Sequence, residues 1–205
     1  RDRELLGFIG GQYAITLDQL AVLIGRSYRT ARGLRARWCT AGWPRSARLS
    51  VELPPFVWLT SRGTSIAGSR FRTWQPNHGL VPHSEAVTNA RLLLEHQLHL
   101  GQWRCERSLA KGFASRSEWR APLPADVLLP PETTAIEVEL TRKSRKRLEQ
   151  IVLDVGIAYD QVWYFAPPRL LPILRELADA APFSNIVVHR YPPSAAEFSA
   201  ATRSA

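Results

Sequence analysis

Methionine is absent from all 205 residues, position 1 included, and only two cysteines occur, Cys39 and Cys105. The missing initiator predicts that the chain is a fragment of a longer protein. Two distant thiols are too few for the disulfide framework of a small secreted domain, and they lack the spacing of a metal site. No apolar run approaches the ~20 residues of a membrane span, and no signal-peptide pattern is present. We therefore expect a cytoplasmic protein with no membrane partner.

Acidic residues are scarce in the first third of the chain, although the whole chain has a formal net charge of +9. Residues 1–75 contain twelve Arg and four acidic residues, whereas the remainder is near charge balance. A basic module joined to a neutral one predicts an anion-binding unit, most plausibly for nucleic acid, attached to a second domain. The length allows one medium domain or two small ones.

Capping signals in the first third predict three helices. Residues 3–10 form an amphipathic pattern, and Thr16 and Gln19 have the spacing of a capping box that opens a helix over 17–24. Gly25 ends that helix, and Ser27 caps the next one, over 28–40. Two helices joined by a short turn with glycine are the helix-turn-helix arrangement.

The second of these helices is strongly basic. Its N-terminal residues suit base edges in the major groove of double-stranded DNA, and its arginines suit phosphates. The alternative is a basic face that is merely solvated. The candidate DNA-binding residues are Ser27, Arg29, Thr30, Arg32, Arg35 and Arg37.

A hairpin over 47–52 and 56–60, then a small helix, completes an order of elements that resembles bacterial winged-helix domains. The tip of this wing, 52–55, has no Lys or Arg to contact phosphate, although Arg45 and Arg48 at its base could partly substitute. We expect a winged helix-turn-helix domain over 1–68. Residues 69–83 show no periodicity and predict a linker.

The rest of the chain predicts a mixed domain over 84–192, followed by a flexible tail over 193–205. Its apolar spacings alternate between those of helices and those of strands. The expected helices are 84–98, 142–155 and 168–180, and the expected strands are 102–107, 125–129, 134–140, 161–166 and 185–190.

Carboxylates occur on an otherwise apolar hairpin in this domain. Glu137 and Glu139 alternate with Ile136 and Val138, and a carboxylate on a buried strand needs a metal ion or a basic partner. If residues 130–133 are the connection, Asp126 lies opposite Glu137 and three carboxylates converge, within roughly 5 Å at Cβ for the opposed pair. Such oxygens suit Mg²⁺. The alternative is a hairpin with one solvated face.

The order helix, strand, hairpin, helix, strand resembles the αβββαβ core of the PD-(D/E)xK nuclease superfamily. The resemblance implies that Asp126 is the acid of the second strand, that Glu137 is the first acid of the third, and that both bind Mg²⁺ or Mn²⁺. Glu139 stands where lysine is usual, and Lys143 could supply the missing positive charge. Glu106 resembles the extra acid that some members place before the hairpin, so the implied metal ligands are Glu106, Asp126, Glu137 and Glu139.

An N-terminal winged helix together with the segments ERSL, ADVLL and IEVELTRKS is similar to the replication-relaxation family of actinobacterial plasmids and mobile elements. This resemblance implies a role in plasmid replication, mobilisation or conjugation, with DNA nicking and with replication or conjugation proteins as partners.

Three functional hypotheses follow. The preferred one is a DNA-binding protein with a metal-dependent nuclease-like domain of mixed α+β or α/β class. The second is a non-catalytic DNA-binding accessory factor on a decayed nuclease scaffold, and the third is a protein-docking module. In the first, a basic run after the hairpin would follow the DNA backbone; it comprises Arg142, Arg145, Lys146 and Arg147.

Overall fold

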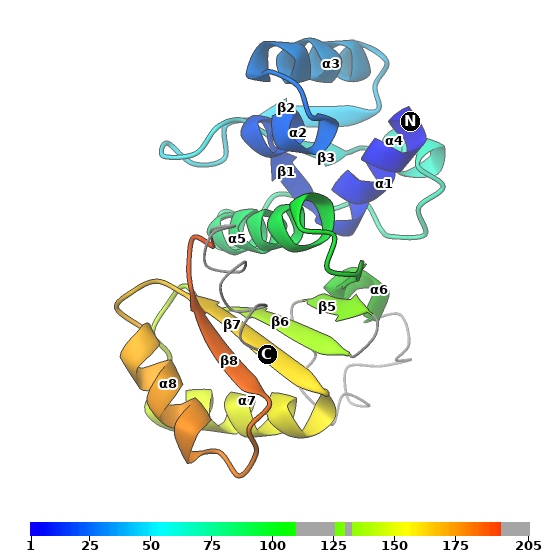
Figure 1. Ribbon diagram of the computed structural model, residues 1–205. Coiled ribbons are helices and arrows are strands. Elements are labelled where there is room, and N and C mark those ends of the chain that lie inside the picture. The colour runs from blue at the N-terminus through cyan, green and yellow to red at the C-terminus, as the bar shows by residue number, and fades with distance from the viewer. Residues whose placement is uncertain (110–125, 130–132, 194–205) are drawn as a thin grey trace. The chain divides into compact units, whose positions relative to one another are not determined.

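The protein is described here by a computed structural model that covers residues 1–109, 126–129 and 133–193 (Figure 1). It is a mixed α+β protein with helices and two sheets. The chain divides into two compact units, Arg1–Thr88 and Asn89–Ala205. The division falls within helix α5 (Val81–Arg91), after the stretch predicted as the linker. The predicted flexible tail, from 194 onward, lies outside the described residues.

No helix in the part of the chain that the structure describes is both long enough and apolar enough to cross a membrane.

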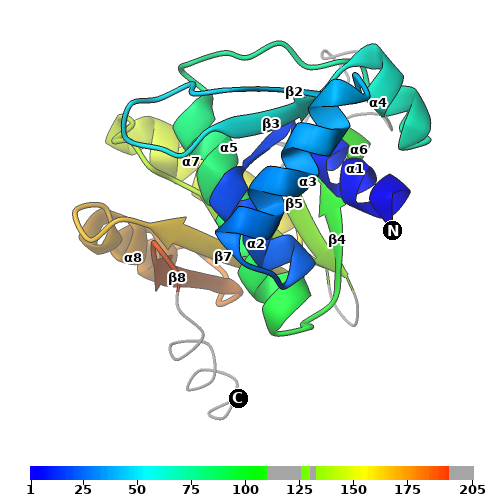
Figure 2. The same cartoon turned by 90° about the horizontal axis from the view of Figure 1, so that it is seen from above.

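The first unit combines helices with a three-stranded antiparallel sheet of order β1-β3-β2. Helices α2 and α3 follow one another and pack together (Figure 2). The elements before α5 are α1 (Asp2–Gly11), β1 (Ala14–Thr16), α2 (Leu17–Ile24), α3 (Tyr28–Thr40), β2 (Pro44–Ala47), β3 (Phe56–Leu59) and α4 (Ser61–Ile66).

Side-chain caps determine where α2 and α3 begin. The Thr16 hydroxyl accepts from the Gln19 amide at 3.2 Å, and the Gln19 side chain accepts from the Thr16 amide at 2.9 Å, so the predicted capping box is confirmed. Gly25 ends α2 with φ +60°, and the Ser27 hydroxyl accepts from the Thr30 amide to begin α3. The Gln19 side chain also donates to the Glu85 carbonyl at 2.8 Å, which ties α2 to α5.

The sheet of the first unit differs from the predicted hairpin. Strand β2 lies at Pro44–Ala47 rather than over 47–52, and β1 was not predicted. Strand β1 is three residues long and wholly buried beside β3, so it shows no alternation of polar and apolar residues. A short buried strand leaves too little pattern to detect in the sequence.

Both faces of this sheet are covered. Val57 and Leu59 face a core shared with α1, α2 and α3. Phe56 and Trp58 alternate to the other face, where they pack with Ala14 and with other apolar residues of the unit.

The second unit is built on a five-stranded sheet of order β4-β5-β6-β7-β8. The first three strands are antiparallel, and β6, β7 and β8 are parallel. The elements after α5 are η1 (Leu92–Gln97), β4 (Gln102–Cys105), α6 (Glu106–Leu109), β5 (Asp126–Leu129), β6 (Thr134–Val138), α7 (Arg145–Ala158), β7 (Gln161–Ala166), α8 (Leu171–Ala180) and β8 (Ile186–Arg190).

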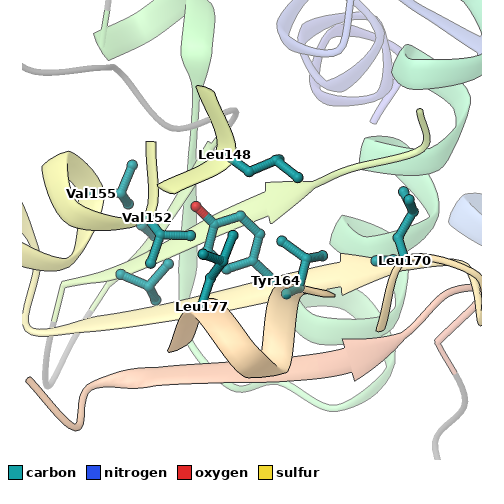
Figure 3. Packing of buried hydrophobic residues seen from close by; sticks show 10 residues of the cluster. Leu148, Val152, Val155, Tyr164, Leu170 and Leu177 are labelled. Atoms are coloured by element: carbon teal, nitrogen blue, oxygen red, sulfur yellow. The ribbon is translucent and has the colours of Figure 1, made fainter. Parts of the chain in front are cut away.

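One face of this sheet packs against α7 and α8. Figure 3 shows the buried Tyr164 ring among Leu148, Val152 and Val155 of α7 and Leu177 of α8. We call this the helix-covered face. Ala135, Val162 and Ala166 contribute from the strands.

A segment at residues 89–97 spans the opposite face. Its Glu95 carboxylate accepts from the Trp103 backbone amide of β4 at 2.9 Å. Its Asn89 side chain donates to the Tyr191 hydroxyl, directly after β8, at 3.1 Å. Since β4 and β8 are the two edge strands, this segment crosses from one edge of the sheet to the other.

Several predicted boundaries from α5 onward are wrong. The helix expected over 84–98 begins at Val81, so Ser84 lies inside it, and its last part, Leu92–Gln97, is a π-helix. Helix α7 begins at Arg145, after the Ser144 hydroxyl that caps it, so Arg142 and Lys143 precede the helix. Glu106 begins α6 instead of ending a strand. The last helix begins at Leu171 rather than at 168.

The close approach of α4 to Trp43 requires glycine at position 63, because a Cβ there would overlap the Trp43 carbonyl oxygen. A backbone atom cannot move aside as a flexible side chain does, so we expect Gly63→Ala to lower the free energy of unfolding by about 2–3 kcal/mol. Chemical denaturation measures this. The matched control is Gly7→Ala in α1, where a Cβ meets no atom within 4 Å. It should raise stability by up to about 1 kcal/mol, since alanine favours the helix. Equal losses in the two variants would contradict the packing argument.

Candidate functional site

The strand register separates the predicted carboxylates. Asp126 pairs with Ile136, Val127 with Ala135 and Leu128 with Thr134. The expected pairing of Asp126 with Glu137 is therefore wrong by one residue. Directly opposed side chains share a face and neighbours alternate, so Asp126 and Glu137 lie on opposite faces of the sheet.

The Asp126 carboxylate is buried, with an exposed fraction of 2%, and it joins two neighbouring elements. One oxygen accepts from the Trp103 indole Nε1 of β4 at 2.5 Å. The other accepts from the Glu106 backbone amide, where α6 begins. The two N–H donors would otherwise need another acceptor inside the protein. Their hydrogen bonds to Asp126 therefore favour burial of this carboxylate, and they favour the observed strand register.

Glu137 and Glu139 lie on the helix-covered face, near the beginning of α7. Glu139 is buried, and its carboxylate forms an ion pair with Lys143 and accepts weakly from the Thr141 amide at 3.4 Å. The structure thus brings Lys143 to Glu139 as an ion-pair partner. Glu137 is half-buried and pairs in register with Tyr164 of β7.

The negative charge of this region affects the pKa values of two tyrosines. Burial raises the pKa of the Tyr164 hydroxyl well above its ordinary value, and the carboxylates of Glu137 and Glu139 raise it further. Burial, followed by Glu137, also raises the pKa of Tyr159. The Tyr164 hydroxyl oxygen is buried and has no hydrogen-bond partner among the described residues.

The donor set implied for Mg²⁺ or Mn²⁺ does not fit the geometry. Asp126 faces away from Glu137 and accepts with both of its oxygens, and Glu139 is neutralised by Lys143. Glu106 belongs to α6 beside Asp126. Across residues 1–109, 126–129 and 133–193, no group of three or more His, Cys, Asp or Glu side chains is arranged to hold a metal ion.

The basic run at the beginning of α7 is exposed, but one of its arginines is already paired with a carboxylate of the protein. The Arg145 guanidinium donates to both carboxylate oxygens of Glu176 in α8, at 2.7 and 3.1 Å. This pairing lowers the pKa of Glu176. Arg142, Lys146 and Arg147 are exposed, so they are the members of the run best placed to meet phosphate.

Helix α3 presents a basic outer side. Ala31 and Trp38 are buried on its inner side. On the opposite side Arg29, Gly33 and Ala36 are exposed, and Arg32 is exposed beside them. Small residues between arginines allow the helix backbone to approach a partner closely while the guanidinium groups reach outward.

The other predicted residues of α3 are partly engaged within the unit. The Arg37 guanidinium forms an ion pair with Asp2 of α1 at 3.1 Å. Arg35 is half-buried. The Ser27 hydroxyl caps the helix and lies 3.0 Å from the Thr30 hydroxyl. Arg29 and Arg32 are therefore the predicted residues of α3 that the geometry leaves most accessible.

Two residues that surround the carboxylates of the second unit were missed from the sequence. Trp103 carries an indole donor into the interior, and Tyr164 carries a hydroxyl into an otherwise apolar strand. A polar atom on a buried aromatic ring usually needs a partner, which is the signal that singles out both residues. Their partners depend on strand order and register, which the sequence alone does not reveal.

Comparison with protein-family models, with curated proteins and with solved structures gave no match, so the functional argument rests on the geometry of the chain itself.

The buried Tyr164 hydroxyl leads to a prediction about pH. Because it has no hydrogen-bond partner among the described residues, Tyr164→Phe should raise the free energy of unfolding by about 1 kcal/mol at pH 7. Its raised pKa means that the folded state keeps the proton while the unfolded state loses it above about pH 10. Wild-type stability should therefore fall as pH rises through that value, and the advantage of the Phe variant should widen. Urea denaturation at pH 7 to 11 measures both effects. A constant difference between the two proteins across this range would contradict the assigned environment.

Proposed function

We propose that this protein binds double-stranded DNA through its first unit, which we interpret as a winged helix with α3 as the recognition helix. The observation that carries the proposal is the outer side of α3, where Arg29 and Arg32 are exposed around Gly33 and Ala36. A basic helix with a small-residue surface suits the major groove, where arginine reads guanine or contacts phosphate.

The surroundings of α3 support the same interpretation. Helix α2 packs against it, and strands β2 and β3 follow, joined by residues 48–55. Arg48 is exposed in that connection and adds positive charge. The net charge of the unit makes DNA affinity fall as salt concentration rises.

We propose further that the second unit is a PD-(D/E)xK-like scaffold that does not cleave DNA. A five-stranded sheet with two antiparallel and two parallel pairings supports this interpretation. The separation of Asp126 from Glu137 favours a non-catalytic accessory factor over a nuclease, since the acids of such a site must share one face. Arg142, Lys146 and Arg147 provide an additional phosphate-binding surface.

We propose, on the resemblance to the replication-relaxation family, that this activity serves plasmid or mobile-element replication or mobilisation. Replication or conjugation proteins are the partners that such a role implies.

The double substitution Arg29→Ala/Arg32→Ala tests the recognition helix. It removes two exposed cations without disturbing the buried side of α3, so we expect duplex DNA affinity to fall by about 10- to 100-fold with unchanged thermal stability. The slope of log affinity against log salt should also become shallower. Fluorescence anisotropy with a labelled duplex measures both. The charge-matched control is Arg175→Ala/Arg190→Ala, which removes two exposed arginines of α8 and β8 and should bind nearly as wild type. A similar loss of DNA affinity in the control would show that net charge, and not the position of Arg29 and Arg32 on α3, determines binding.

Substitution of the carboxylates tests the non-catalytic assignment. Supercoiled plasmid incubated with the protein and Mg²⁺ or Mn²⁺ should remain intact, and Asp126→Ala and Glu137→Ala should keep wild-type DNA affinity. Asp126→Ala should lower the free energy of unfolding by about 2–4 kcal/mol, because it removes the acceptor of two buried donors, whereas Glu137→Ala should lower it by less than about 1 kcal/mol. Nicking that requires the divalent ion and disappears in a folded Glu137→Ala protein would restore the nuclease hypothesis.

A further inference from the structure

A small cavity in the first unit lies on the sheet face opposite α3. Its volume is about 270 Å³, and it lies between β2, β3 and residues 73–75. Arg45 and Trp58 are directly opposed in the β2–β3 register, so their side chains share this face. The core that holds α3 is formed instead by Val57 and Leu59, which alternate to the other face.

The cavity has an aromatic wall of fixed geometry. Trp74 meets Trp58 edge to face, with ring centroids 6.4 Å apart and an interplanar angle of 86°. Tyr13 holds the same Trp74 ring from another direction at 6.2 Å. Trp58 is almost fully buried, whereas Trp74 is only half-buried and lines the cavity. A partly exposed indole held by two other rings is a ready surface on which a planar ligand can stack.

The remaining lining determines the charge and polarity of the ligand. Arg45 is exposed, and it is the single charged side chain among the described residues that line the cavity. The exposed Ser61, Thr73 and Gln75 supply hydroxyl and amide groups that can both donate and accept hydrogen bonds. The site therefore favours an anionic ligand with a planar ring and polar edges. Its volume is slightly below the range of pockets for drug-sized ligands, which suits one ring system with its substituents.

The geometry points to a nucleotide-binding pocket in which a nucleobase stacks on Trp74, polar side chains meet its edge, and Arg45 pairs with its phosphate. Stacking on an aromatic ring and pairing with a cation is how proteins hold unpaired bases. The nucleotide can be a free mononucleotide or one residue of a single strand. Duplex DNA on α3 would contact the other face of the sheet, so this pocket is a second site and does not rest on the proposed recognition helix.

Titration with dAMP, adenosine and single-stranded (dA)10 tests the pocket in the full chain. We expect dAMP to bind with a dissociation constant below about 1 mM. Its binding should shift the indole N–H NMR resonances of Trp58 and Trp74. The variants Trp58→Phe and Trp74→Phe assign these two resonances among those of the seven tryptophans. Arg45→Gln should weaken dAMP about tenfold and leave adenosine unchanged, because only the phosphate meets the guanidinium. Arg48→Gln, which removes a neighbouring exposed arginine outside the cavity, should leave both ligands unchanged.

The outcomes separate the two sources of the nucleotide. Equal affinities for dAMP and (dA)10 would identify a free nucleotide, and a much tighter (dA)10 complex that is still sensitive to Arg45→Gln would identify a single strand. Unmoved Trp58 and Trp74 resonances with both probes, or equal effects of Arg45→Gln and Arg48→Gln, would overturn the proposal. Duplex binding should persist in Arg45→Gln, so failure here and failure of α3 as a recognition helix remain distinguishable.

Discussion

The buried carboxylate of Asp126 connects three parts of the second unit: strand β5, the indole of Trp103 on β4, and the amide that begins α6 at Glu106. A buried charge is tolerated only where donors surround it, so this carboxylate and its donors stabilise one another. The pairing of β5 with β6 agrees with that arrangement. The face that Glu137 and Glu139 share follows from this register, because a shift of one residue would exchange the two faces.

The division of the carboxylates between the two faces changes what the second unit can do. On the helix-covered face Glu139 is matched by Lys143, and Glu137 lies beside the ring of Tyr164. This is a local balance of charge at the start of α7 and not an open cluster of anions. Most of the cations just before and within the first turn of α7 remain outside that balance and face solvent, which suits contact with a polyanion.

Local signals in the sequence were sufficient to predict the limits of some helices but not the register of the hairpin. The limits of α2 and α3 agree with prediction because Thr16, Gln19 and Ser27 act within a few residues of their own position. The hairpin register could not be predicted in this way. Val127 and Leu128 are both buried, so the apolar pattern does not indicate which face either residue takes. Where both faces of a strand are covered, the register depends on contacts with residues far away in the chain.

The Gln19 side chain closes the capping box of α2 through its oxygen and holds the Glu85 carbonyl of α5 through its nitrogen. One planar amide therefore serves two helices at once. Rotation of that amide would release both bonds together, so the first turn of α2 and its hydrogen bond to α5 depend on the same side chain. Hydrogen exchange in these two segments should then report a single cooperative opening, although 66 residues separate the two partners in the chain.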